Sequence, residues 1–239
     1  MAWDRLAPLT AFLRARLSPE GYLGLHLTLG ALVMIAAGWL FGGIAEAVAG
    51  SNTISLIDGD IARWLHANAN PPLTKFMLLI THVHGVLGII VLSLLTGVVF
   101  IWKKEWYWLL GLAVSVAGGM IINVLVKHAF HRARPSFDDP LLMLTTYSFP
   151  SGHTAGSTLF YGVVTTYLFY RIRSWRWRIP IVVVAVLMVI AVGLSRMYLG
   201  VHYLSDVLGA IAESTAWLAL SLTTISALRR RNEALSLNE

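Results

Sequence analysis

Three short clusters of charged and polar residues hold the residue types that could bind an anionic group and transfer it. They lie at Lys127–Pro135, Pro150–His153 and Ser195–Asp206. Lys127, Arg134 and Arg196 supply three positive charges, and the planar fork of an arginine side chain suits two phosphate oxygens at once. The chemistry that these residues favour is recognition of a phosphate or a similar anion.

The second cluster has the pattern of a helix start. Pro150 suits the first position of a helix, which would leave the N–H groups of Ser151, Gly152 and His153 directed outward. A helix N-terminus of this kind binds anions, glycine lets an anion approach the backbone, and the Ser151 hydroxyl adds a donor. We therefore expect this segment to cradle the phosphate.

The third cluster contains a histidine and a carboxylate at helical spacing. His202 and Asp206 are four positions apart, so on a helix they share one face. A carboxylate there can hold the imidazole in the tautomer whose other nitrogen is free to attack. His153 is the remaining titratable group and is suited to protonate a departing oxygen. The set predicts a nucleophile, its orienting acid and a general acid.

The composition indicates that membrane helices position these clusters. Hydrophobic residues make up 57% of the 239 residues, charged residues only 13%, and the mean hydropathy is +0.70. Globular domains carry about 25% charged residues. Such a chain cannot cover a soluble surface, which argues against a free cytosolic enzyme, a coiled coil or a disordered tail. Cysteine is absent, which excludes a disulfide framework and a thiolate metal site.

Six stretches are apolar enough, over roughly 20 residues, to cross a hydrocarbon layer about 30 Å thick. They run near Tyr22–Ala45, Phe76–Trp102, Trp106–Phe130, Ser151–Tyr170, Ile179–Tyr198 and Tyr203–Leu228. We interpret the first as a retained span, because its apolar run is longer than the core of a secretory signal. The expected fold is an all-α polytopic bundle of six transmembrane helices in a single domain, residues 1–239.

The basic residues predict the orientation of this bundle. With the N-terminus in the cytoplasm, short cytoplasmic segments carry 12 of the 18 lysines and arginines, as the positive-inside rule favours. These are Arg5, Arg14, Arg16, Lys103, Lys104, Arg171, Arg173, Arg176, Arg178, Arg229, Arg230 and Arg231. Both termini are then cytoplasmic and all three polar clusters reach the extracytoplasmic face. The net charge of +6 is a topology signal that needs no nucleic acid.

A short helix is expected in the outer loop between about Val48 and Thr74. Ile57, Ile61, Trp64 and Leu65 have the spacing of one helix face there. We interpret it as a packing element in the membrane interface, although a lid over the site is an alternative.

The three clusters resemble the three-part signature of the type 2 phosphatidic acid phosphatase family, at every fixed spacing between residues 127 and 206. The motifs are Lys127-x6-Arg134-Pro135, then Pro150-Ser-Gly-His153, then Ser195-Arg196-x5-His202-x3-Asp206. Hydropathy extends the resemblance to the six-helix membrane branch of that family. The resemblance implies removal of phosphate from a lipid phosphate or pyrophosphate without a metal ion or other cofactor.

Site roles follow from the resemblance by position. His202 would attack phosphorus and form a phosphohistidine, Asp206 would orient it, and His153 would protonate the leaving group and then assist water. The phosphoryl oxygens would be held by Lys127, Arg134, Ser151, Gly152 and Arg196. The substrate would enter sideways from the bilayer of a plasma (inner) membrane. Undecaprenyl pyrophosphate is the first expectation, followed by phosphatidylglycerol phosphate and phosphatidate.

Three alternatives stay open at this point. Each cation could be an interfacial residue that reaches toward head groups, and His202 with Asp206 could be a structural pair. The same site could transfer phosphate to another lipid instead of water. A lipid transporter could also place cations near helix ends, although it would typically carry broken helices or inverted repeats. The sequence makes no prediction of the oligomeric state.

Overall fold

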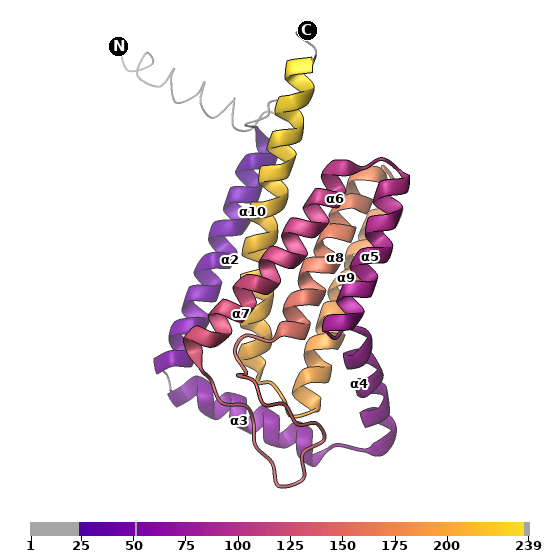
Figure 1. The fold of residues 1–239 in the computed structure, drawn as a ribbon. Helices are drawn as coiled ribbons and strands as arrows, with labels where there is room; N and C mark the ends of the chain where they lie inside the picture. The colour runs from indigo at the N-terminus through magenta and orange to yellow at the C-terminus, as the bar shows by residue number, and fades with distance from the viewer. Residues whose placement is uncertain (1–23, 51, 237–239) are drawn as a thin grey trace, which may run out of the picture.

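The computed structural model describes residues 24–50 and 52–236, and all the regular structure within them is helical (Figure 1). The helices are α2 (Leu25–Gly50), α3 (Asn52–Ala67), α4 (Pro71–Val83), α5 (Val86–Trp102), α6 (Trp106–Ala113), α7 (Gly119–Phe130), α8 (Gly152–Arg171), α9 (Trp175–Tyr198) and α10 (Leu204–Ser236). A π-helical turn, η1 (Val114–Gly118), joins α6 to α7. The predicted all-α fold is confirmed. The start of the first predicted span and the basic residues Arg5, Arg14 and Arg16 lie outside the described residues.

The predicted count of six membrane spans is not confirmed. Four helical stretches are long and apolar enough to cross a membrane: Leu25–Gly50, Trp106–Phe130, Trp175–Tyr198 and Leu204–Glu233. The bent pair α4–α5 would make a fifth. The predicted span Ser151–Tyr170 matches α8, which carries many Ser, Thr and Gly residues and is not among the four. Because most of the first half of α8 is buried by other helices, it needs no apolar face toward lipid.

The second predicted span, Phe76–Trp102, is broken rather than continuous. Helix α4 ends at Val83, α5 begins at Val86, and the two axes differ by 52°. The His84 ring lies at the break, with Nδ1 2.9 Å from the Ile80 carbonyl oxygen and Nε2 2.8 Å from the Tyr161 hydroxyl. A side chain at Gly88 would lie 1.9 Å from the Val83 carbonyl oxygen, so the bend requires glycine there.

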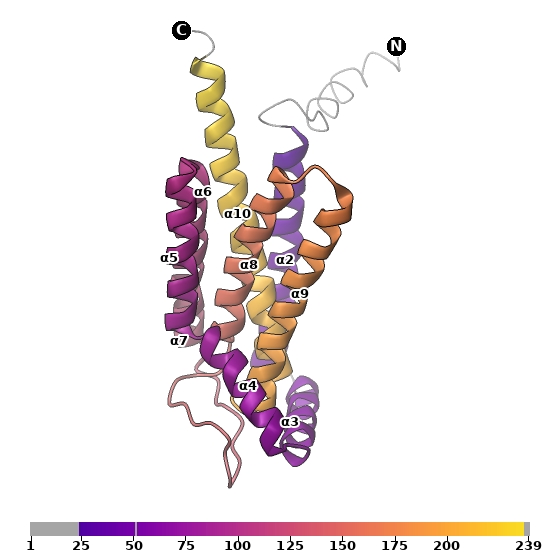
Figure 2. The ribbon, with the colours of Figure 1, turned by 90° about the vertical axis from the view of Figure 1, so that its right-hand side faces the viewer.

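Helix α8 lies at the centre of the bundle, between the α5–α6–α7 group and α9, with α2 and α10 on a further side (Figure 2). Its buried side chains Phe160, Val163 and Tyr167 pack with Phe100 of α5 and Leu112 of α6. Aromatic and aliphatic burial of this kind is the main source of packing energy in the interior. A central helix fixed on several sides gives the site at its N-terminus a rigid base.

The two ends of the bundle have different contents. The lower end in Figure 1 holds the loop from α7 to α8, the turn from α9 to α10, and helices α3 and α4. The upper end holds the α5–α6 and α8–α9 connections and the end of α10, which carry the described basic residues predicted to be cytoplasmic. The predicted grouping of these basic segments at one end, opposite the polar clusters, is therefore present in the fold.

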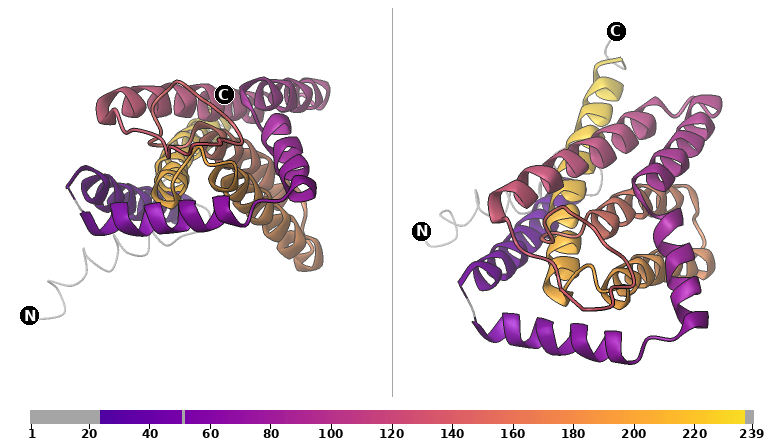
Figure 3. Two further views of the ribbon diagram at one scale, coloured as in Figure 1. Left: turned by 90° about the horizontal axis from the view of Figure 1, so that it is seen from below. Right: turned by 60° about the horizontal axis from the view of Figure 1, so that its bottom comes forward.

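Helices α3 and α4 form two sides of a rim around the long α7–α8 loop when the bundle is seen from the lower end (Figure 3). Helix α3 is the short outer helix that the sequence predicts. Its Ile57 and Trp64 side chains are exposed, whereas Asp58 and Ala62 are buried against the protein. The apolar side chains thus face outward, as in a helix that lies in a membrane interface, and a carboxylate faces inward.

Candidate active site

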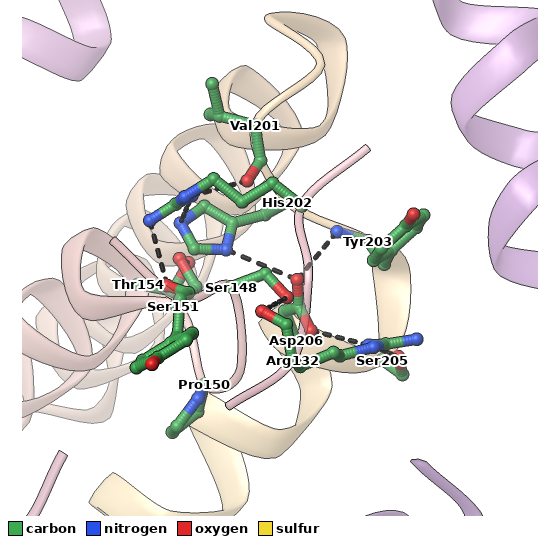
Figure 4. Close-up of polar contacts among 12 residues, drawn as sticks. Arg132, Ser148, Pro150, Ser151, Thr154, Val201, His202, Tyr203, Ser205 and Asp206 are labelled. Carbon is green, nitrogen blue, oxygen red and sulfur yellow. Dashed lines mark hydrogen bonds and ion pairs between the residues drawn. The ribbon is translucent and has the colours of Figure 1, made fainter. Parts of the chain in front are cut away.

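His202 lies in the turn between α9 and α10, two residues before Leu204, the first residue of α10. Gly200 opens this turn with φ of +71°, a left-handed conformation that favours glycine. The His202 ring is buried, and its Nδ1 lies 3.3 Å from Oδ2 of Asp206, which is fully buried in the first turn of α10. The Tyr203 backbone N–H also donates to Oδ2, at 2.9 Å. Figure 4 shows the ring and the carboxylate facing each other.

The second nitrogen of His202 faces a cation. Arg134 Nη1 lies 3.1 Å from His202 Nε2. Because a guanidinium only donates, Nε2 must accept, and the ring proton sits on Nδ1 toward Asp206. Burial lowers the pKa of His202 to about 3, although Asp206 acts in the opposite direction. The imidazole is therefore neutral at neutral pH, with a lone pair on Nε2, which is the state that a nucleophile needs.

The three predicted cations are held in different ways. Lys127 Nζ donates to the carbonyl oxygens of Tyr147 and Pro150, each at 2.8 Å. Arg134 Nε donates to the carbonyl oxygen of Thr146 at 2.6 Å, in addition to its contact with His202. These bonds anchor both cations to the α7–α8 loop, and the positive charge of Arg134 lies beside the histidine.

Arg196 is the cation whose bonding is incomplete. Its side chain is 1% exposed, and Nη1 donates to the Thr81 hydroxyl at 2.7 Å. Nε and Nη2 are buried, and neither has a hydrogen-bond partner among residues 24–50 and 52–236. A buried donor without an acceptor costs about 1–3 kcal/mol, and more when it is charged. An anion beside Arg196 would remove this cost.

The start of α8 differs from the prediction. Pro150 follows Phe149 through a cis peptide bond and precedes the N-cap residue Ser151, so it is not the first residue of the helix. The Ser151 N–H donates to the Asp206 carbonyl oxygen at 3.1 Å and is not free for an anion, because it ties the start of α8 to that of α10. The N–H groups of Gly152 and His153 occupy the first helical positions, which have no acceptor within a helix. They remain suited to an anion.

His153 lies between the cationic cluster and an apolar cavity. It interacts electrostatically with Arg196, His202 and Arg134. Together with Gly152 it also lines a cavity of about 500 Å³ between α5, the α6–α7 segment and α8. The structure therefore brings His153, His202, Asp206, Arg134 and Arg196 together. Lys127, Ser151 and Gly152 border the same region through the start of α8.

Several residues around the site carried no predicted role. Arg132 Nη1 donates to Asp206 Oδ1 at 2.6 Å, and Nη2 donates to Asp58 Oδ2 at 2.7 Å. Burial lowers the pKa of Arg132, but Asp206 and Asp58 outweigh it, so the net pKa is raised. Thr81 of α4 receives the bond from Arg196. Arg132 lies within the first cluster, so the sequence could have suggested a role for this charged residue. Asp58 and Thr81 lie outside all three clusters, and no sequence pattern pointed to them.

The helices long and apolar enough to cross a membrane, with a buried histidine beside two arginines at one end of the bundle, indicate a membrane protein whose candidate site suits an anionic group. Comparison with known sequences then gives the family. The PAP2 superfamily profile matches residues 108–230, and the chain belongs to this superfamily of membrane lipid phosphatases. The predicted family is confirmed.

Two relatives and two solved structures are similar to this chain. Phosphatidylglycerophosphatase B of Bacillus subtilis is 30% identical over 176 residues, 73% of this chain and 86% of that protein. Undecaprenyl-diphosphatase BcrC of the same organism is 29% identical over 102 residues, 41% of this chain and 48% of that protein. The crystal structure of the first transmembrane PAP2 type phosphatidylglycerolphosphate phosphatase from Bacillus subtilis has a TM-score of 0.72 and 27% identity, covering 79% of this chain and 93% of its own. Aquifex aeolicus LpxE, with a TM-score of 0.57, 22% identity and coverage of 70% and 94%, shares the fold.

Proposed function

We propose that this protein hydrolyses phosphate from a lipid phosphate or pyrophosphate through a phosphohistidine on His202. The observation that carries the proposal is a buried histidine in contact with Arg134 and under the electrostatic influence of a second arginine, Arg196, which is buried and incompletely hydrogen-bonded. Arg196 has two donors for phosphoryl oxygens, and His202 Nε2 has a lone pair for phosphorus. Arg134 contacts that nitrogen and would move its donor to the entering phosphate.

In the first step, the lone pair of His202 Nε2 forms a bond to phosphorus while the bond from phosphorus to the leaving oxygen breaks. The Nδ1–H bond to Asp206 stabilises the positive charge that develops on the imidazole. The negative charge of the bound phosphate favours the protonated form of His153, which then delivers its proton to the leaving oxygen. The products of this step are the phosphohistidine and the dephosphorylated lipid, or the lipid monophosphate when the substrate is a pyrophosphate.

In the second step, water attacks phosphorus and the bond to Nε2 breaks, releasing inorganic phosphate. His153, now unprotonated, accepts the proton of the water. Lys127, Arg134, Arg196 and the N–H groups at the start of α8 hold the equatorial oxygens in both steps. Because phosphoryl transfer depends mostly on positioning and electrostatic stabilisation, these fixed cations can replace a metal ion. The described part of the chain contains no group of three or more side chains placed to ligate a metal.

The cavity beside His153 supports a lipid substrate. Its lining is almost entirely apolar, and on α5 it extends from Val86 to Ile101. A helix rises about 1.5 Å per residue, so this wall is about 22 Å long, which suits an acyl or prenyl chain. The phosphate would lie at head-group level at the mouth of the cavity, with the tail in the hydrocarbon layer.

We propose the inner membrane as the location, with the site on the extracytoplasmic face and both termini in the cytoplasm. The clustering of basic residues at the end opposite the site supports this orientation. Arg132 bonds both Asp58 of α3 and Asp206 of α10, so distant parts of the chain contribute to the site, which supports a single domain. Among substrates, phosphatidylglycerol phosphate should be tested first, because the relative named for it aligns along most of the chain. Undecaprenyl pyrophosphate and phosphatidate follow.

The test is a panel of lipid phosphates and pyrophosphates given to the purified protein with excess chelator. Phosphate release from at least one lipid by the wild type, and its loss in His202→Ala, is the expected result. Strict dependence on magnesium would contradict the metal-free mechanism. Mass spectrometry of the lipid products separates the alternatives, since a phosphotransferase makes a phosphorylated acceptor lipid and a transporter releases no phosphate.

A further inference from the structure

Asp58 is a buried carboxylate that lies outside every motif of the sequence. It comes from α3, the interfacial helix, and is 1% exposed. We propose that Asp58 is a positioning residue for the His202–Asp206 pair, acting through Arg132 and Ser205. This inference rests on the proposed function, because it concerns the same nucleophile.

The first connection runs through Arg132. One end of its guanidinium donates to Asp206 at 2.6 Å, and the other donates to Asp58 at 2.7 Å. The guanidinium also lies over the Tyr203 ring, 4.5 Å from the ring centre. Because the fork is planar and bonded at both ends, the position of Asp58 determines the angle at which Arg132 meets Asp206.

The second connection runs through the first turn of α10. Asp58 Oδ1 accepts a hydrogen bond from the Ser205 backbone N–H at 3.1 Å, and Oδ2 accepts one from the Ser205 hydroxyl. Ser205 N–H is among the first N–H groups of α10, which lack partners within the helix. Asp58, although it belongs to another helix, therefore caps the N-terminus of α10 at Ser205, the residue before Asp206. Its negative charge suits the positive end of the α10 helix dipole.

The charges of these groups explain why a second carboxylate is needed. Arg132 alone would neutralise Asp206, so the pair would offer little negative charge to the imidazole. With Asp58 present, two carboxylates share one guanidinium, and the group of three carries a net negative charge. Asp206 can then stabilise the positive imidazole that forms when His202 bonds to phosphorus. Helix α3 thus contributes to the reaction and is more than a packing element.

The test compares Asp58→Asn with Asp60→Asn in the full-length protein in lipid nanodiscs. Asp60 is two residues away on the same helix, but its side chain is exposed and pairs only with Arg63 among the described residues. Asparagine at position 58 keeps the size and one acceptor oxygen for the Ser205 N–H, but it loses the charge and the second oxygen, which accepts from Arg132 and the Ser205 hydroxyl. We expect kcat to fall about ten- to a hundredfold in Asp58→Asn, with KM nearly unchanged, and no change in Asp60→Asn.

A ligand pair separates positioning from a purely structural role. Inorganic phosphate reports on the cationic cradle alone, whereas orthovanadate can accept His202 Nε2 as a fifth ligand. Asp58→Asn should weaken inhibition by vanadate about tenfold and leave inhibition by phosphate unchanged. Equal weakening of both inhibitors would mean that Asp58 only holds the fold, and would overturn the proposal.

A double variant tests the charge argument independently of fold. In Asp58→Asn with Arg132→Gln, Asp206 regains its full charge, so the double variant should be more active than the product of the two single effects predicts. Multiplicative losses, or an Asp58→Asn variant as active as Asp60→Asn, would refute the inference. A wild type that releases no phosphate from any lipid would instead refute the proposed function.

Discussion

The two polar ends of the bundle are built from the same residue types but differ in burial. At the site end, Arg132 and Asp206 are 2.6 Å apart, and Asp206 is fully buried. At the opposite end, Arg171 and Glu105 are 3.4 Å apart, and the arginine side chain is 54% exposed. An exposed pair contributes about 0–1 kcal/mol, whereas breaking a buried pair costs about 3–5 kcal/mol. Burial, rather than the number of charges, marks the end that we propose as the active site.

The largest effect is expected from Asp206→Asn, which removes the charge behind the nucleophile and permits the wrong histidine tautomer. In serine proteases, the comparable change in the orienting carboxylate lowers kcat about ten-thousandfold. We expect kcat to fall by at least about a thousandfold here, with a smaller change in KM. Steady-state kinetics on the best lipid of the panel measure it. A fall in kcat of less than tenfold would mean that Asp206 matters no more for activity than the exposed charged residues at the opposite end, and would contradict its proposed role.

The same substitution at both ends tests the comparison directly. Lysine at Arg196 keeps the charge but loses the planar fork, with its two unpartnered donors. Loss of preorganised donors costs about a hundred- to a thousandfold in kcat. Arg171→Lys should change kcat less than about twofold, since exposed pairs contribute little. Similar losses in both variants would show that the two ends do not differ in function.

A smaller effect is expected when the cavity is narrowed. Ala117 lines the cavity, and phenylalanine there should raise KM for long-chain lipid phosphates about tenfold while sparing a short, water-soluble phosphate ester. Ala36→Phe on the exposed side of α2 is the matched control. The measurement is KM against chain length. An Ala117→Phe variant that impairs short and long substrates equally would argue that the cavity does not hold the tail.

The smallest effect concerns pH and stability. The pKa of His202 is lowered by burial to about 3, from about 6.5 in an unfolded chain. The unfolded state therefore binds the proton more readily, and the folded state loses stability as pH falls from about 6.5 toward 3, with no change above that window. The Tm of His202→Gln should fall less between pH 7 and pH 5 than the Tm of the wild type. Parallel falls would mean that the folded protein does not hold this histidine neutral.

The spacing of polar residues pointed to candidate site residues, and the structure brings three of them, His202, Asp206 and Arg134, into contact. Their roles stay predictions, and the predicted count of six spans is not confirmed. The charge bias of membrane loops assigned Arg171 to the other end of the chain's topology, and the fold places it at the end of the bundle opposite the polar clusters. Hydropathy did not predict the break after Val83, since apolar residues continue on both sides of it and the bend depends on His84 and Gly88.

Contacts between distant segments were the part that local patterns could not supply. The bond between Asp58 and Ser205 joins positions 147 residues apart, and no helical periodicity links them. Ser151 is a similar case, because its N–H is used by the Asp206 carbonyl oxygen rather than by an anion. A sequence motif shows which residues are present. Which of their N–H groups are free for an anion depends on how α3 and α10 pack against the site, and local patterns do not show this.

The most direct test of the central claim is the isolation of the covalent intermediate. The protein is mixed with a substrate that carries labelled phosphate, quenched within the first turnovers, digested under alkaline conditions and analysed by mass spectrometry. The account predicts an acid-labile, alkali-stable phosphate on His202 in the wild type and none in His202→Ala. Phosphate on another side chain, or a His202→Ala variant that turns over as fast as the wild type, would contradict it.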